Sequence, residues 1–228
     1  MFKLLLIPIL LITAISAQAD DSVVDKIIAI QKMNNDWKPS IVEISDEITD
    51  RDGKPEYIMT VSAKSSANGY MIEKAQEDGK DVDADNKDAL ELIKQEEEFI
   101  AGTDFNEEDV TVNSTRYLGR EQCGETICEK YRFLIHAETV SFKIVFLLRK
   151  DDLLPMSYTL TALMPFKNEG AYVTSFTREV KFNDDINRWY PVSKVERSEF
   201  EIKKFMLTWD GINTTKVTYK DYQTGKVQ

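Results

Sequence analysis

Histidine and cysteine are scarce in this chain of 228 residues, which has one histidine, His136, and two cysteines, Cys123 and Cys128. An acyl-transfer triad cannot be assembled, because no serine or cysteine stands in a nucleophile motif that could use His136. Two cysteines and one histidine at unrelated spacing also fall short of a zinc ligand set. No glycine-rich phosphate-binding motif occurs. The sequence therefore predicts a protein that is not an enzyme and that uses no cofactor and no metal.

Basic residues are outnumbered, with 29 Lys and Arg against 40 Asp and Glu and a formal net charge of −11. Phosphate backbones are bound by concentrated Lys and Arg, and anionic membrane surfaces attract the same residues. We therefore expect neither a nucleic-acid partner nor binding to a bare anionic membrane.

Long apolar runs are lacking beyond the N-terminus. Leu4 to Ile15 is apolar, Lys3 precedes it, and the small residues of Ala17-Gln18-Ala19 follow it, which is the pattern of a cleaved bacterial export signal. A run of about twelve residues is too short to span a membrane, which takes ~20. We expect a signal peptide over 1–19 and a periplasmic product that does not span the membrane. No Pro- or Gly-rich linker follows, so 20–228 is expected to form one domain.

The two cysteines, Cys123 and Cys128, flank a short turn centred on Gly124-Glu125. In an exported chain such a pair most simply forms a disulfide across a hairpin. A redox-active pair is the weaker interpretation, because the spacing is not Cys-x-x-Cys.

Two segments, 22–34 and 87–101, have the apolar spacing of amphipathic helices. In the second, the apolar positions are Leu90, Ile93 and Phe99, between glutamates. A helix with one apolar face has to cover something, so we expect both to pack on a sheet. Three residues of the first helix would form the inner side of a lid: Val24, Ile27 and Ile28.

The stretch from Ser62 to Asp88 breaks the strand pattern and is expected to be a solvated loop. Within it, Asp81, Asp83 and Asp85 have the spacing of a calcium loop. The match then fails, because Leu92 stands where a bidentate Glu is required. The sequence favours solvent over a cation here, and it leaves cation binding at Asp81–Asp88 open.

Short strands with turn signals between them fill the rest of the chain, most clearly from Ala171 to Tyr222. We expect roughly nine to eleven strands in a mainly β (α+β) fold, a curved antiparallel half-open β-barrel with covering helices. The strand at 141–149 has the most continuous apolar face, and later strands are expected to add to it. The predicted ligand-binding residues are Phe142, Ile144, Phe146, Leu148, Phe176, Phe205 and Trp209.

The closing strands resemble those of a known family, through Arg188-Trp-Tyr-Pro-Val-Ser-Lys-Val-Glu196 and Thr215-Lys-Val-Thr-Tyr-Lys-Asp-Tyr222. They are similar to the periplasmic outer-membrane lipoprotein carriers and the sorting proteins related to them. This resemblance implies a half-open barrel whose lid helices cover an apolar cavity that receives acyl chains.

Three classes of function remain open. The first is a non-enzymatic periplasmic module that binds a lipid, another apolar ligand or an acylated protein on the concave face of the sheet. The second is an envelope protein-interaction or sensor module on the same scaffold, with a filled core. A hydrolase is a distant third, because it would have to be built around His136 or one of many acids.

Overall fold

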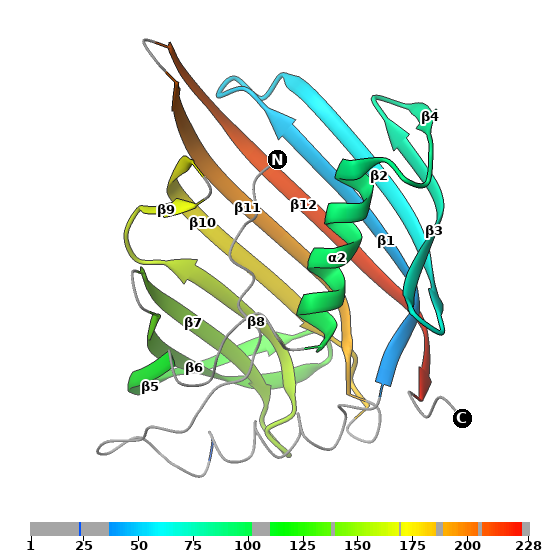
Figure 1. The fold of residues 1–228 in the computed structure, drawn as a ribbon. Coiled ribbons are helices and arrows are strands. Elements are labelled where there is room, and N and C mark those ends of the chain that lie inside the picture. Colours follow the sequence, from blue (N-terminus) through cyan, green and yellow to red (C-terminus); the bar gives the residue numbers. More distant parts are fainter. Residues whose placement is uncertain are drawn as a thin grey trace.

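The computed structural model describes Val23 and residues 37–101, 110–137, 140–168, 170–185, 189–204 and 207–224. These residues form twelve strands and the helix α2 (Figure 1). The first elements are β1 (Trp37–Thr49), β2 (Pro55–Ser66), β3 (Gly69–Glu77), β4 (Lys80–Val82) and α2 (Lys87–Ala101). They are followed by β5 (Val110–Cys123), β6 (Thr126–Ala137), β7 (Val140–Arg149) and β8 (Pro155–Ala162). The last are β9 (Phe166–Asn168), β10 (Ala171–Phe182), β11 (Pro191–Lys204) and β12 (Leu207–Thr224).

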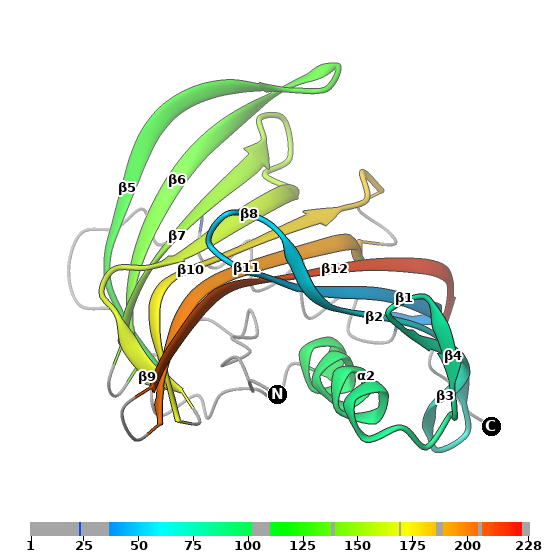
Figure 2. The same cartoon turned by 90° about the horizontal axis from the view of Figure 1, so that it is seen from above.

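All twelve strands belong to one antiparallel sheet, in the order β4-β3-β2-β1-β12-β11-β10-β8-β7-β6-β5, and β9 pairs with β10. The first and last strands pair from Trp37↔Thr224 to Thr49↔Ile212. Strands β4 and β5 form opposite edges, so the sheet is open. Figure 2 shows that it curves strongly around one side. The predicted fold class, a mainly β, curved antiparallel half-open barrel with helical cover, is confirmed. Among the described residues the covering helix is α2, and the strands number twelve, one more than the nine to eleven expected.

Helix α2 lies on the concave side of the sheet (Figure 2) and coincides with the segment predicted at 87–101. Asn86 caps it, because its Oδ1 accepts hydrogen bonds from the backbone N–H groups of Asp88 and Ala89 at 3.0 and 3.1 Å. Of the three apolar positions predicted to face the sheet, Ile93 and Phe99 are buried, whereas Leu90 is 48% exposed. The side chains that α2 buries are Ala89, Leu92, Ile93, Glu96 and Phe99.

The helix predicted at 22–34 lies outside the described residues, apart from Val23. Val23 is helical and 2% exposed, and it belongs to the hydrophobic core cluster. The lid residues Val24, Ile27 and Ile28 are not among the described residues, so their role stays a prediction.

The expectation of a loop over Ser62–Asp88 is wrong, because this stretch contains the end of β2 and all of β3 and β4. Small polar residues hide the alternation, and a register shift at Ser62/Ala63 breaks its period. Gly69 is required at the β2–β3 turn, where its φ is +114° and Glu97 of α2 approaches so closely that a Cβ atom would collide with it. The Glu97 carboxylate accepts a hydrogen bond from the backbone N–H of Tyr70 at 2.7 Å, which ties this hairpin to α2.

Strand register shows which side chains share the concave face. Lys194 of β11 contacts Glu96 of α2, and it lies opposite Val180. Val180 lies opposite Tyr158, which in turn lies opposite Phe146. The inner face of β7 therefore lies on the same side of the sheet as α2. The helix packs against that side at other strands, farther along the sheet.

Aromatic rings form a ladder across the inner face of β6, β7, β8 and β10. Phe133 and Phe146 meet edge to face with centroids 5.6 Å apart, and Phe146 and Tyr158 are also 5.6 Å apart. The ladder continues through Phe182, 6.0 Å from Tyr158, to Trp189, whose ring is 4.3 Å from that of Phe182. Such pairs add about 0.5–1.5 kcal/mol each beyond the area they bury.

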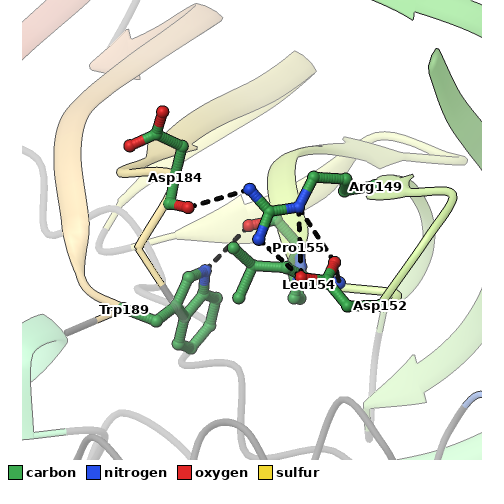
Figure 3. A network of polar contacts seen from close by, with 6 residues as sticks. All are labelled: Arg149, Asp152, Leu154, Pro155, Asp184 and Trp189. Carbon is green, nitrogen blue, oxygen red and sulfur yellow. Dashed lines mark hydrogen bonds and ion pairs between the residues drawn. The ribbon is translucent and has the colours of Figure 1, made fainter. Parts of the chain in front are cut away.

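A polar network clamps the end of this ladder (Figure 3). Arg149 Nε and Nη2 donate to the Asp152 carboxylate at 3.0 and 2.5 Å, and Arg149 Nη1 donates to the backbone oxygen of Asp184 at 2.9 Å. Trp189 Nε1 donates to the backbone oxygen of Pro155 at 2.7 Å. The β7–β8 turn is thereby fixed to the segment that follows β10.

The β5–β6 hairpin carries the disulfide between Cys123 and Cys128, with Cα atoms 5.8 Å apart. The turn at Gly124-Glu125 lies where it was predicted. Edge strand β5 also has two register shifts against β6, at Val112/Ser114 and at Tyr117/Gly119, and such bulges increase local twist.

We expect replacement of both Cys123 and Cys128 by serine to lower the free energy of unfolding by about 2 kcal/mol, since a loop this short restricts the unfolded chain only modestly. Urea denaturation followed by circular dichroism measures the change. Mass spectrometry of exported protein should show no free thiol, and two free thiols would contradict the prediction.

Arg149→Met should lower the free energy of unfolding at neutral pH by about 1–2 kcal/mol, because bonds to a charged carboxylate are lost. The hydrogen bonds from Arg149, which outweigh burial, lower the pKa of Asp152 below its ordinary value. The stability from Asp152 is therefore present above the ordinary carboxyl pKa and is lost as the pH falls through the lowered pKa. Urea denaturation at pH values across this acid range should show that the free energy of unfolding declines less with falling pH for Arg149→Met than for wild type. Equal declines would contradict this role of Asp152.

Candidate functional site

The concave face has two chemically different halves. The apolar half consists of the inner side chains of β6, β7 and β8 and of the apolar inner side chains of β10. The helix half lies beneath α2 on β1, β2, β11 and β12, and it includes Arg178 of β10. In Figure 2, α2 lies under the second half and away from β5 to β8.

Most predicted ligand-binding residues lie in the apolar half. Phe142, Ile144 and Phe146 are each 1% exposed, and Leu148 is 0% exposed. Phe176 is also 1% exposed. The ring of Phe166 links it to Phe142, because the Phe166 centroid is 6.4 Å from that of Phe176 and 6.3 Å from that of Phe142. These five residues are therefore brought together.

The other two predicted ligand-binding residues are not placed in that half. Phe205 lies outside the described residues. Trp209 is 40% exposed and lies in the helix half, where it lines a cleft beside α2.

The helix half contains a buried cluster of charges that the sequence interpretation missed. Arg178 Nε lies 2.5 Å from Glu196 Oε1, and Lys194 Nζ lies 3.5 Å from the same oxygen. Lys194 also pairs with Glu96 of α2, whose other oxygen accepts a hydrogen bond from the Tyr219 hydroxyl at 2.7 Å. All five residues are at most 5% exposed. The cluster therefore joins α2 to β10, β11 and β12.

The ring of Phe99 covers this cluster, 4.6 Å from Lys194 Nζ and 5.6 Å from Arg178 Cζ, so α2 supplies a cation–π contact as well as a carboxylate.

The charge balance of the cluster explains how it tolerates burial. Burial acts to raise the pKa of Glu196, but the charges of Arg178 and Lys194 outweigh it and hold that pKa below its ordinary value. Burial and the Glu96 carboxylate raise the pKa of Tyr219, so its hydroxyl stays protonated and donates. Two cations and two carboxylates neutralise one another within the cluster.

One sequence signal could have located Arg178. Phe176, Val180 and Phe182 surround it at period two in Phe176-x-Arg178-x-Val180-x-Phe182, which places the arginine on the apolar face of its strand. No local signal points to Glu96 as the partner of Lys194, because the two residues lie 98 positions apart and meet only when α2 docks on the sheet.

A cleft of about 280 Å³ lies beside the cluster, between α2 and the sheet. Its sheet side is formed by Asp46 and Ile48 of β1, Tyr57 of β2, Glu196 of β11, and Trp209, Asn213 and Thr215 of β12. Its helix side is formed by Asp88, Leu92 and Gln95.

Asp46 of β1 lines this cleft and is only 6% exposed. Its carboxylate accepts a hydrogen bond from the Thr215 hydroxyl at 2.6 Å. Burial raises the pKa of Asp46 above its ordinary value, and the carboxylates of Glu196 and Asp88 add to the rise. The cleft thus disfavours a further negative charge.

The acidic stretch from Asp81 to Asp88 is partly structural in the folded chain. Asp81 accepts from Gln76 at 2.9 Å, Asn86 caps α2, and Asp88 accepts from the Tyr57 hydroxyl at 3.3 Å. Across the part of the chain that the structure describes, no group of three His, Cys, Asp or Glu residues is arranged to hold a metal ion. Nor do those residues include a helix long and apolar enough to cross a membrane.

The only histidine of the sequence, His136, is exposed near the end of β6, and its ring lies beside the Ser141 hydroxyl.

No protein-family model matches the chain, and no curated protein matches it in sequence. The fold is similar to the crystal structure of a candidate outer membrane lipoprotein-sorting protein domain from Vibrio parahaemolyticus, with 10% sequence identity and a TM-score of 0.43. The match covers 91% of this chain and 94% of that one.

Breaking the buried pair between Glu96 and Lys194 should be strongly destabilising. We expect Glu96→Gln and Lys194→Met each to lower the free energy of unfolding by about 3 kcal/mol, because each leaves a buried charge without its partner. The double variant should lose less than the sum of the two. Urea denaturation of all four proteins measures this coupling.

The exposed pair Lys94–Glu98 on the same helix, with atoms 3.9 Å apart, is the control. Glu98→Gln should lower the free energy of unfolding by only about 0.3–0.5 kcal/mol. Strictly additive effects of Glu96→Gln and Lys194→Met would contradict the proposed coupling.

Proposed function

We propose that this protein is a non-enzymatic binding module of the bacterial envelope that receives an apolar ligand, a lipid or the acyl chain of a lipoprotein, on the apolar half of its concave face. The observation that carries the proposal is the aromatic and aliphatic inner face of β6, β7 and β8, which Phe176, Val180 and Phe182 continue on β10 on both sides of the buried Arg178. Curved sheets with such a face suit acyl chains, because these are bound by apolar area and not by directed hydrogen bonds.

The chemical contrast between the two halves supports this assignment. The helix half is filled by Glu96, Lys194 and their partners, which fix α2 through charge. The apolar half instead presents the ladder from Phe133 to Trp189 and the half-buried Met156. Methionine and aromatic side chains adapt to apolar ligands of varied shape.

The N-terminal segment is proposed as the lid over this half. Val23 is buried in the core cluster, which supports contact between the segment and the sheet. Val24, Ile27 and Ile28 would continue that contact, and a ligand would have to displace them. Exposing their apolar area costs about 25 cal/mol per Å², so the lid opens when a ligand replaces the contact.

Periplasmic location is part of the proposal. The predicted signal over 1–19 would export the chain, and the disulfide between Cys123 and Cys128 fits an oxidising compartment.

The alternative is an envelope protein-interaction or sensor module with a filled core. The burial of Phe142, Phe146 and Phe176 to 1% exposure favours it, because a filled face needs no ligand. In that case the partner would be a protein bound at another surface.

Binding of an apolar fluorescent probe to wild-type protein separates the two functions. Phe146→Asp should weaken this binding at least tenfold, because it places a charge in the middle of the aromatic ladder. Lys143→Asp, on the outer face of the same strand, should bind as wild type does. Fluorescence titration measures both, and circular dichroism checks that each variant is folded.

If Phe146→Asp does not fold, Ile144→Thr is the milder variant, because it replaces a buried ethyl group on the same face by a hydroxyl without adding a charge. A folded variant of either kind with wild-type affinity would contradict ligand binding in the apolar half. Native mass spectrometry of gently purified protein should also show a co-purified lipid. Its absence, together with no probe binding, would support the filled core.

A further inference from the structure

The cleft between α2 and strands β1, β11 and β12 lies apart from the apolar half, and its lining has an imbalance of charge. It contains the carboxylates of Asp46, Asp88 and Glu196, and none of its described lining residues is Lys, Arg or His. Two buried cations, Arg178 and Lys194, form ion pairs with Glu196, and neither lines the cleft. Among the described ion pairs, none joins Asp46 or Asp88 to a cation. A positive charge in the cleft would restore the balance.

The rest of the lining suits a cation on an apolar stem. Leu92 and Ile48 offer aliphatic surface, and Tyr57 and the exposed Trp209 offer aromatic rings. Trp209 is held in place, since its Nε1 donates to Glu56 at 3.0 Å. An aromatic face attracts a guanidinium or ammonium group, and the aliphatic stem of Arg or Lys packs against apolar side chains.

Gln95 points to a second feature of the occupant. Its side-chain Nε2 is shielded from solvent and makes no hydrogen bond within the described structure, although Gln95 lines the cleft. A buried amide N–H needs an acceptor, and the carbonyl oxygen next to a basic side chain in a peptide could supply one. The ligand is therefore expected to carry both a cation and a neutral acceptor.

Size and polarity exclude an acyl chain from this cleft. Its volume of about 280 Å³ lies below the roughly 300–1,000 Å³ of pockets for drug-sized ligands. A hydrocarbon would also leave the buried Asp46, which forms no ion pair among the described residues, without water or counter-charge. A single lysine or arginine side chain fits both the volume of the cleft and its acidic lining.

We propose that the cleft binds a lysine or arginine side chain of a polypeptide partner. The cation would lie between Asp46 and Glu196, and the stem would lie against Leu92 and Trp209. The neighbouring carbonyl would accept from Gln95.

Nuclear magnetic resonance titration with acetyl-arginine methylamide tests the proposal on the full exported protein. The indole N–H signal of Trp209, assigned with Trp209→Phe, should shift and saturate at millimolar probe. The citrulline analogue has the same shape without the charge, and it should bind at least tenfold more weakly.

Asp46→Asn is the decisive variant, because it removes the charge but keeps an acceptor for Thr215. It should weaken arginine binding at least tenfold. Glu47→Gln changes the net charge equally on the opposite face of β1 and should leave binding unchanged. If Asp46→Asn does not fold, Asp88→Asn replaces it as the test variant.

Three results would overturn the proposal: no shift of Trp209, equal binding of the citrulline analogue, or equal losses in Asp46→Asn and Glu47→Gln. The apolar probe should bind Asp46→Asn as it binds wild type, because its site is in the other half. Failure of the cation site and failure of the apolar site are therefore separate results.

Discussion

The chain leaves its sheet at one edge and returns to it at the other, and this constraint determines the remaining architecture. Because β1 pairs with β12, the hairpins β2–β4 extend the sheet in one direction and β11 to β5 extend it in the other. The connection from β4 to β5 has to cross a face of the sheet. Helix α2, the described part of this connection, lies on the concave face over β1, β2 and β12 (Figure 1).

The way in which α2 is fixed explains why the two halves differ. A crossing helix could have docked through apolar contacts alone, yet α2 buries Glu96 among Lys194, Tyr219 and Phe99. A buried ion pair adds little net stability over an apolar contact, but it penalises any other position of the helix. One half of the concave face is thereby committed to holding α2 at one place, and the apolar half is free for different chemistry.

Local signals in the sequence were enough to predict β7, α2 and the cysteine hairpin. The alternation from Phe142 to Leu148, the helical spacing of 87–101 and the Cys123–Cys128 turn each lie within one element. Strand β3 was missed because Ser65, Ser66 and Gly69 obscure its boundary with β2. The buried charge cluster was missed because Glu96 and Lys194 come together only through helix docking, and Asp46 meets Thr215 only through the pairing of the first and last strands. One sequence reveals neither where a helix docks, which decides the first contact, nor the strand register that decides the second.

An open sheet leaves two rows of backbone groups that could pair with strands of other chains, and the two edges of this fold limit that risk in different ways. Strand β4 has three residues, too few for a stable ladder with a foreign strand. Strand β5 is long, but its two bulges interrupt the regular spacing of donors and acceptors along its free side. The sheet can therefore remain open at both edges without becoming a template for aggregation.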